Sequence, residues 1–233
     1  KDKKDSGLID AGMPQLATKG SLGNPFEKTW SEFTPKVSLR YRASPDLMYF
    51  GLYSKGFRAG GFSGRPGTYA AASTAYNPET VDNFEVGIKS EWLDHRLRLN
   101  ASAYLMKYND KQEEQSVPTG VGTGQQTIVV NAATAELKGL EVELLAIPTH
   151  GMTLALSLGL LDAKYTKFTE PDISGCVPGE ICVPVDVDIS YLKLRRAPKI
   201  TATFTPSYEW TAGAGTASVQ ASWHYISALE LTF

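Results

Sequence analysis

Two cysteines, Cys176 and Cys182, are the residues whose type and spacing most directly suggest chemistry. They enclose a short stretch in which Pro178-Gly179 can make the turn that closes a disulfide. Metal binding or redox exchange is the rival interpretation, but no histidine is close in sequence and the Cys-x-x-Cys spacing is absent. We therefore expect a disulfide between Cys176 and Cys182, which fits an oxidising compartment outside the cytoplasm.

The three histidines do not suggest a catalytic or metal centre. His95 and His150 fall in short turns and His224 in a strand-like segment, so we expect no shared coordination shell. No Ser/His/Asp, Cys/His or zinc-type spacing stands out elsewhere. We predict that the chain is not an enzyme and has no catalytic residues, no metal site and no cofactor.

A glycine-rich segment at residues 60–64 is surrounded by side chains suited to ligand binding. It lacks the strand-to-helix context of a phosphate-binding loop. Arginine and aromatic side chains on an outer loop can instead contact an anionic or aromatic ligand, although solvated loop residues without a ligand are the plainer alternative. The candidates for ligand contact are Arg58, Phe62, Arg65, Tyr69 and Tyr76.

These candidates lie in loops between amphipathic strands, and the connections alternate in length. Tight turns fall at residues 44–46, 94–95, 149–151 and 212–215, built from residue types that accept turn dihedrals at little steric cost. Long polar loops are expected near residues 60–79, 111–127 and 169–192. This alternation places all short turns at one rim and all long loops at the other, as in transmembrane β-barrels.

Each strand-like segment has one apolar face and one small or polar face. In the segment after the turn at 94–95, one parity is apolar and the other polar: Leu97, Leu99, Ala101, Ala103 and Leu105 oppose Arg98, Asn100, Ser102 and Tyr104. Similar patterns occur around residues 84–92, 152–160 and 200–210. A soluble antiparallel sandwich would show the same alternation, so the alternation alone does not choose between the two.

Strand length and aromatic placement favour the membrane. The stretches 97–110 and 197–210 exceed the usual soluble length of about five or six residues and reach the roughly 9 to 11 that a tilted strand needs to cross a bilayer. Aromatic residues predict two interfacial girdles. Trp92, Tyr208 and Trp210 lie next to short turns, and Tyr108, Tyr165 and Phe168 lie at the opposite strand ends.

Composition excludes several classes of protein. With 23 Lys and Arg against 25 Asp and Glu, the formal net charge is 23 − 25 = −2, so no basic surface for nucleic acid is expected. No apolar run approaches the roughly 20 residues of a membrane helix. The charged residues 1–5 are followed by no hydrophobic segment, so we expect no signal peptide in the sequence as it stands.

Several motifs, taken together and in order, resemble the barrel of TonB-dependent outer-membrane receptors. Residues 77–89 resemble that family's "PE...N.E.G.K" strand, and residues 131–133 with 137–143 resemble its "NA...KG.E.E" strand. The segments 35–41, 48–62, 104–112 and 197–199 also fit. The resemblance covers roughly residues 33–223, and no single motif would suffice.

The resemblance implies an all-β, antiparallel up-and-down transmembrane barrel, in the outer membrane of a Gram-negative bacterium and in contact with its lipid. Such transporters have about 22 strands around a plugged lumen, so about eight strands correspond to a C-terminal part of a larger barrel. Residues 35–233 would form this barrel portion, and residues 1–34 an extracellular loop or lead-in segment. The implied function is uptake of a scarce solute, with a ferric siderophore as the expected one, energised by a TonB-type partner through a plug domain that this chain is expected to lack.

The inward-facing motif residues have a structural interpretation. Gly87 and Gly139 would leave space for whatever fills the barrel. The charged side chains of this parity would line the lumen, where pairing with a plug, with one another or with water is favoured over ligand contact. They are Glu85, Lys89, Glu91, Glu141 and Glu143.

Two alternatives from other classes stay open. A stand-alone eight-strand barrel could act as an anchor or adhesin, with strand 36–44 paired to strand 216–233. A soluble binding sandwich would instead bury the faces of Leu97 and Leu154 against each other.

Overall fold

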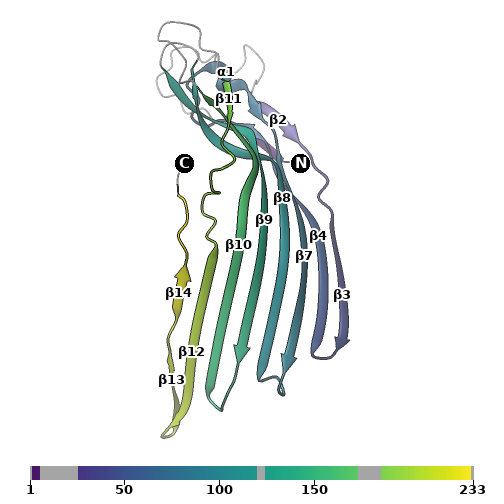
Figure 1. Cartoon of the computed structure of the whole chain (residues 1–233), viewed down its shortest axis with the longest axis vertical. Coiled ribbons are helices and arrows are strands. Elements are labelled where there is room, and N and C mark those ends of the chain that lie inside the picture. Colours follow the sequence, from purple (N-terminus) through teal and green to yellow (C-terminus); the bar gives the residue numbers. More distant parts are fainter. Residues whose placement is uncertain (1, 6–25, 120–123, 173–184, 232–233) are drawn as a thin grey trace.

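The computed structural model describes residues 2–5, 26–119, 124–172 and 185–231. One antiparallel sheet dominates it, with the order β13-β12-β10-β9-β8-β7-β4-β3, so that long strands consecutive along the chain are neighbours in space (Figure 1). The long strands are β3 (Lys36–Ser44), β4 (Leu47–Arg58), β7 (Glu79–Trp92), β8 (Leu97–Pro118), β9 (Gln125–Ala146), β10 (Met152–Asp172) and β12 (Ile200–Ala212). The predicted up-and-down antiparallel architecture is confirmed.

The eighth strand is interrupted. β13 (Gly215–Gln220) and β14 (Trp223–Ile226) both pair with the same edge of β12. Between them, the amide of Ala221 still donates to the carbonyl of Pro206. Within the described residues β3 pairs only with β4, and β13 and β14 only with β12, so the sheet is open at both edges. The pairing that a closed eight-strand barrel requires is therefore not made in this part of the chain.

The register places the apolar parity of every strand on one continuous face. One row across neighbouring strands consists of Leu99, Leu144, Leu156, Phe204 and Trp223. Many side chains of this face are solvent-exposed in the isolated chain, including Leu39 at 75% and Val86 at 63%. A soluble sandwich would bury such a face, whereas a barrel turns it toward lipid.

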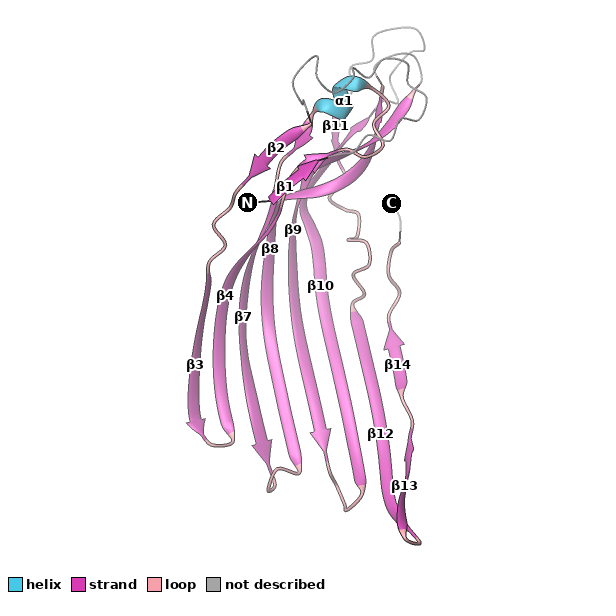
Figure 2. Cartoon of the chain, turned by 180° about the vertical axis from the view of Figure 1, so that it is seen from behind, coloured by secondary structure: helices cyan, strands magenta, loops and turns pink. Residues whose placement is uncertain are grey.

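The short turns gather at one rim of the sheet and the longer connections at the other (Figure 2). Beside the short turns, Trp92, Tyr208 and Trp210 stand on the apolar face and are 42–51% exposed, where the first aromatic girdle is predicted. The rings of Tyr208 and Trp210 stack with centroids 5.9 Å apart. This rim carries the interfacial aromatic side chains that a barrel requires.

The second predicted girdle is wrong. Tyr165 and Phe168 are only 5% and 1% exposed, and Tyr108 packs against them. Tyr108 and Tyr165 already belong to the lumen-facing parity of β8 and β10, and the register shift in β10 after Tyr165 brings Phe168 to the same side. These three rings therefore pack on the polar, lumen-facing side of the wall, in a small core.

One of the predicted long loops is largely strand, and strands also enter both described parts of another, at 169–172 and 185–188. β8 continues to Pro118 and β9 begins at Gln125, so the expected loop at 111–127 is mostly a hairpin, and β10 continues to Asp172. The polarity of residues such as Glu113 and Glu114 suggested a loop. Beyond the lipid, however, a paired strand can be polar on both faces, because its backbone groups are satisfied by the ladder.

The inward glycines receive the ring of a neighbouring strand. A Cβ at Gly139 would collide with the ring of Tyr104, which lies directly opposite on β8. A Cβ at Gly87 would lie 2.5 Å from the ring of Phe50 on β4. The expectation that these glycines leave space for the barrel contents is wrong, because aromatic side chains of the wall already occupy that space.

We expect the substitution Gly139→Ala to destabilise the complete protein by about 1–3 kcal/mol, because the Tyr104 ring must leave its place. Gly51→Ala is the matched control, since nothing lies within 4 Å of a Cβ at that position. Urea unfolding in detergent measures both. In the Tyr104→Ala background the cost of Gly139→Ala should fall, and an unchanged cost in that double mutant would contradict the packing explanation.

The lead-in segment contains a small sheet. β1 (Asp2–Asp5) pairs with β2 (Glu27–Trp30), and Trp30 is buried close to Gly60. Lys55 of β4 binds Glu32. The boundary at residue 34 stays a prediction. In the described residues no helix has both the length and the apolar character that a membrane crossing needs.

Candidate functional site

Four of the five predicted ligand contacts lie in the connection between β4 and β7, and the fifth, Arg58, is the last residue of β4. This connection contains β5 (Gly61–Phe62), helix α1 (Tyr69–Ser73) and β6 (Ala75–Tyr76). Thr68 caps the helix by accepting a hydrogen bond from the amide of Ala71 at 3.2 Å. Short elements of this kind hold a loop in one conformation with few residues.

The structure gives these five residues different surroundings. Phe62 is 9% exposed and packs edge-to-face on Phe26, which also contacts Tyr69. Arg65 binds Glu114 at 3.3 Å, Tyr76 lies against Gly61, and Arg58 is exposed at the end of β4. These residues lie close together at the rim opposite the short turns, here called the outer rim. Their ligand role stays a prediction. Cys176 and Cys182 lie outside the described residues.

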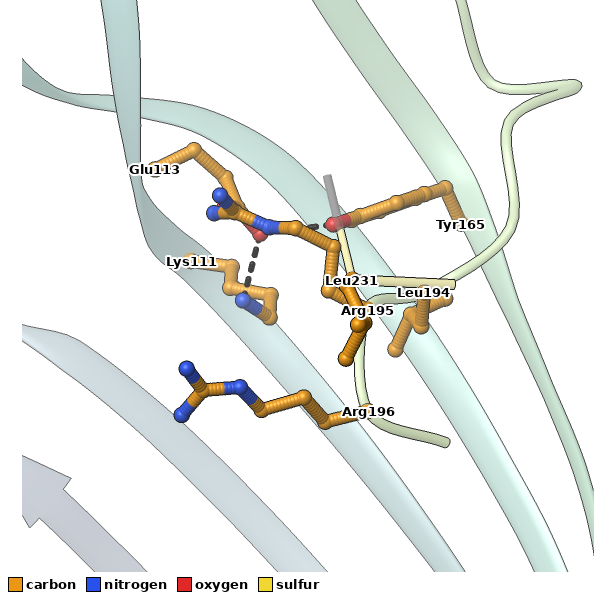
Figure 3. A pocket seen from close by; sticks show the side chains of 7 residues that line it. All are labelled: Lys111, Glu113, Tyr165, Leu194, Arg195, Arg196 and Leu231. Atoms are coloured by element: carbon orange, nitrogen blue, oxygen red, sulfur yellow. Dashed lines mark hydrogen bonds and ion pairs between the residues drawn. The ribbon is translucent and has the colours of Figure 1, made fainter. Parts of the chain in front are cut away.

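A second site centres on the buried carboxylate of Glu113, which is 2% exposed. Lys111 binds its Oε1, the hydroxyl of Tyr165 donates to the same oxygen at 2.7 Å, and Arg195 binds Oε2 at 2.7 Å (Figure 3). Lys111 and Glu113 come from β8, Tyr165 from β10, and Arg195 from the segment before β12. One carboxylate thus joins three parts of the chain that are far apart in sequence.

Electrostatics keep this carboxylate ionised. Burial works against the charge, but hydrogen bonds from Lys111, Tyr165 and Arg195, with the positive charge of Lys111, outweigh it and lower the pKa of Glu113 below its usual value. The site lies beyond the apolar band of the wall. Burial and the hydrogen bond to Glu113 raise the pKa of Tyr165, so its hydroxyl stays protonated.

A small hydrophobic core supports these charges. Ala133, Ala135, Tyr165, Phe168 and Leu194 are buried together. The connection between β11 (Val185–Asp188) and β12 lies over the wall here, because the amide of Ile189 donates to the carbonyl of Phe168 at 2.8 Å. This connecting segment places Leu194, Arg195 and Arg196 on the lumen side.

Residues of the motifs that resemble the family stabilise the register shift in β8 beside this site. The side chain of Asn131 accepts from the amide of Asn77 and donates to the carbonyls of Asn77 and Asp110, at 2.7–2.9 Å. Glu79 accepts the amide of Gln112 at 2.8 Å. Asp110 has a left-handed φ of 52° at the register shift. These side chains satisfy backbone groups that the irregular strand leaves without ladder partners.

Four of the five charged residues predicted to line the lumen lie around one polar hollow. Glu85, Lys89, Glu141 and Glu143 line one hollow together with Asn100, which donates to Glu143 at 3.4 Å. Their predicted place on the inward parity is confirmed by the register.

Glu91 belongs to a separate cluster at the short-turn rim. Its Oε2 contacts Nδ1 of His95 at 2.5 Å and its Oε1 accepts from Arg98 at 2.9 Å, while Asp46 lies 4.0 Å from His95. The hydrogen bond to Glu91 raises the pKa of His95 above its usual value. Three potential metal ligands meet here, but both oxygens of Glu91 are already paired, so the geometry is that of an ion-pair cluster.

The Glu113 site was missed because Lys111 and Glu113 were placed in a loop and Tyr165 in a lipid-facing girdle. The one available signal is the polar run 111–115 next to strand-forming residues. The partner Arg195 lies 82 residues away from Glu113, and no local pattern connects the two.

The fold and the wall define a class: a segment of an outer-membrane β-barrel with lipid-facing apolar rows and a polar lumen face. Residues 11–229 match the family described as "TonB dependent receptor-like, beta-barrel". The chain therefore belongs to the TonB-dependent receptor family, and the resemblance inferred from its motifs is confirmed. Members of this family are outer-membrane proteins of Gram-negative bacteria and serve as transport receptors.

Similar proteins include receptors for metal chelates. The metal-pseudopaline receptor CntO of Pseudomonas aeruginosa is 29% identical over 141 residues, which cover 60% of this chain and 18% of that protein. The ferric yersiniabactin uptake receptor FyuA of Yersinia pestis superposes with a TM-score of 0.62 at 16% identity, covering 88% of this chain and 28% of that one. The ferric preacinetobactin receptor BauA of Acinetobacter baumannii gives 0.58 at 20% identity, covering 89% and 27%. The chain spans less than a third of each relative.

Proposed function

We propose that this chain forms part of the wall and outer loops of a receptor that takes up a scarce metal chelate, most specifically a ferric siderophore. The single observation that carries the proposal is the family match over residues 11–229 on a wall whose register separates lipid from lumen. The relative CntO is named a metal-pseudopaline receptor, and two structural neighbours are named receptors for ferric chelates. Chelates of metals other than iron belong to the same substrate class.

Energy for uptake would come from a TonB-type protein of the inner membrane, acting through a plug domain. The polar hollow of Glu85, Lys89, Glu141 and Glu143 supports this part of the proposal, because such a wall needs a hydrated or charged filling. A wide lumen without a filling would leak solutes.

The test is chelate uptake by the host bacterium, with the gene for the complete protein deleted or restored. We expect accumulation of iron from ferric siderophores to fall on deletion, and to fall equally when a protonophore dissipates the membrane potential. Accumulation that depends on the gene but persists with the protonophore would argue for a passive pore. A panel of copper, nickel and zinc chelates, read by elemental analysis, identifies the metal.

The anchor or adhesin alternative makes a different prediction about size. Intact mass of the native polypeptide from outer membranes should be about threefold above the 25.3 kDa of this chain if about 22 strands and a plug belong to it. A mass near 25.3 kDa would favour the small closed barrel and would overturn the uptake proposal.

A further inference from the structure

Four lysines stand on the lipid-facing side of the wall, where the apolar rows end near the outer rim. They are Lys107 on β8, Lys138 on β9, and Lys164 and Lys167 on β10, three strands that are neighbours in the sheet (Figure 1). We propose that this lysine cluster binds the anionic, phosphate-bearing headgroups of lipids in the outer leaflet of the membrane. The partner is a lipid and not the transported solute, so the inference goes beyond the proposed function.

The strand register decides which face of the wall carries the cluster. Leu140 and Leu160 lie opposite each other in one of the apolar rows. Two same-face positions farther toward the outer rim, Glu136 lies between Lys107 on one side and Lys164 on the other. Because side chains alternate between the two faces of a strand, this charged row stands on the same lipid-facing side as the two leucines.

Lys167 reaches the same face through the register shift in β10. Phe168 is buried in the core on the lumen side, so the side chain before it points to the opposite face. Lys167 lies opposite Thr134, whose hydroxyl is hydrogen-bonded to that of Thr166 at 2.7 Å. It therefore stands one same-face position nearer to the outer rim than the row of Glu136.

Strand length places the cluster at the level of lipid headgroups. Leu97 lies opposite Trp92 of the first aromatic girdle, and the span from Leu97 to Lys107 is 11 residues. A tilted strand needs about 9 to 11 residues to cross the hydrocarbon layer. Short turns mark the periplasmic side of such barrels. Lys107 is therefore expected at the opposite interface, which is that of the outer leaflet.

The cluster carries positive charge that the wall does not neutralise. In its two rows nearest the outer rim, Lys107, Lys164 and Lys167 accompany a single carboxylate, Glu136. That carboxylate already pairs with Lys138 at 2.8 Å. The other three lysines are exposed, and in the part of the chain that the structure describes none of them joins an ion pair.

Three further carboxylates lie near the cluster without cancelling this charge. Asp162 stands one same-face position farther from the outer rim than the row of Glu136. Asp82 accepts a hydrogen bond from the hydroxyl of Tyr53 at 2.8 Å. Glu32 pairs with Lys55 at 2.5 Å. Five lysines thus accompany four carboxylates, and two of the lysines without an ion pair stand together on β10.

The apolar row next to the cluster identifies the partner as a lipid. Leu140, Leu160 and Ile200 lie side by side in this row, which acyl chains cover in a membrane barrel. The headgroup of a lipid on this row lies against the positions that follow toward the outer rim. Lysine side chains keep their stems on apolar surface and extend the ammonium group to the polar level. There each ammonium group can donate to phosphate oxygens and attract anionic lipid.

The test uses the complete receptor, purified in detergent, and native mass spectrometry to count bound lipids. The probes are dioleoylphosphatidic acid and dioleoylphosphatidylcholine, which share their acyl chains but differ in net charge. We expect the anionic lipid to bind more tightly. Its affinity should fall about fivefold in Lys164→Gln and about thirtyfold in Lys164→Gln/Lys167→Gln, with binding of the zwitterionic lipid unchanged. Lys164→Arg/Lys167→Arg keeps both charges and should stay close to wild type.

Lys36→Gln is the matched control for Lys164→Gln. Lys36 is exposed near the outer end of the wall, but it lies opposite Ser54 on the lumen-facing parity of β3. Its affinity for the anionic lipid should stay within about twofold of wild type, because the same charge is lost on the wrong face. An equal fall in both glutamine variants would mean that only the overall charge matters, and would overturn the site.

Three other outcomes would also overturn the inference. Equal binding of the two lipids by the wild type would remove the preference for a phosphate headgroup with net charge. A loss in the arginine variant as large as in the glutamine variant would assign the effect to strand geometry and not to charge. Unchanged affinity in Lys164→Gln/Lys167→Gln would leave these lysines as a surface for an acidic protein partner.

Discussion

Replacing Leu156 by arginine should prevent or strongly impair assembly of the barrel in the membrane. Leu156 lies between Leu144 and Phe204 in the middle of an apolar row that crosses the sheet. An arginine facing lipid near the bilayer midplane costs about 2–4 kcal/mol. That cost is a large fraction of the total stability of an ordinary domain. We expect less folded protein in the outer membrane and a lower urea midpoint for the fraction that assembles.

The neighbouring Ser157 offers a matched control, because it projects from the opposite face of the same strand. It lies between Glu143 and Thr203 and is exposed on the lumen side. Ser157→Arg places the same cation next to a carboxylate in a hydrated space, so its assembly should stay close to wild type. If the two arginine variants assemble equally well, the assignment of faces is wrong. Equal impairment would point to strand disruption and not to lipid exposure.

The assignment of faces could be predicted from the sequence because it depends on local alternation. Leu97 to Leu105, Leu154 to Leu160 and their polar neighbours repeat with period two, and strand pairing can only place the apolar sets together. The short turns could also be predicted from local sequence, because a β-turn is determined by four consecutive residues. The eight-strand meander therefore follows from patterns that each span about ten residues.

The outer rim could not be predicted in the same way. There the register shift after Tyr165 changes the parity of β10, so Phe168, which simple alternation places on the lipid side, faces the lumen core. The side chains that stabilise the register shift in β8 act over long sequence distances, such as Asn131 on Asn77. Tertiary contacts of this kind leave no periodic signal, because one amide side chain satisfies backbone groups on two segments far from it in sequence, at Asn77 and at Asp110.

Among substitutions at the outer rim that replace a charged residue with a neutral one, Glu113→Gln should have the largest effect. We expect it to destabilise the complete protein by about 2–4 kcal/mol. The carboxylate is 2% exposed and pairs with Lys111 and Arg195, whose side chains are 21% and 35% exposed. Removing one partner of a buried ion pair leaves its counter-charges uncompensated at about 3–5 kcal/mol. The partial exposure of both cations lowers that figure. Glutamine keeps the shape of the side chain and can still accept the hydrogen bond from Tyr165. The loss of stability therefore measures the contribution of the negative charge.

The dependence on pH has a defined sign. Because the pKa of Glu113 is lower in the folded protein than its usual value of 4.5, its contribution is fully present above that value. It is lost as the pH falls through the lower folded value. The difference in urea midpoint between wild type and Glu113→Gln should therefore be constant from neutral pH to about pH 5 and shrink only in stronger acid.

Glu114 provides the comparison that separates a buried charge from an exposed one on adjacent residues. It pairs with Arg65 at 3.3 Å, and the two side chains are 54% and 75% exposed. Such surface pairs contribute about 0–1 kcal/mol, so Glu114→Gln should shift the urea midpoint little. A similar loss in both variants would mean that general charge at the rim, and not the junction at Glu113, stabilises the protein. A large loss at Glu113 alone would identify this carboxylate as the residue that fixes the segment of Arg195 and Arg196 to the barrel wall.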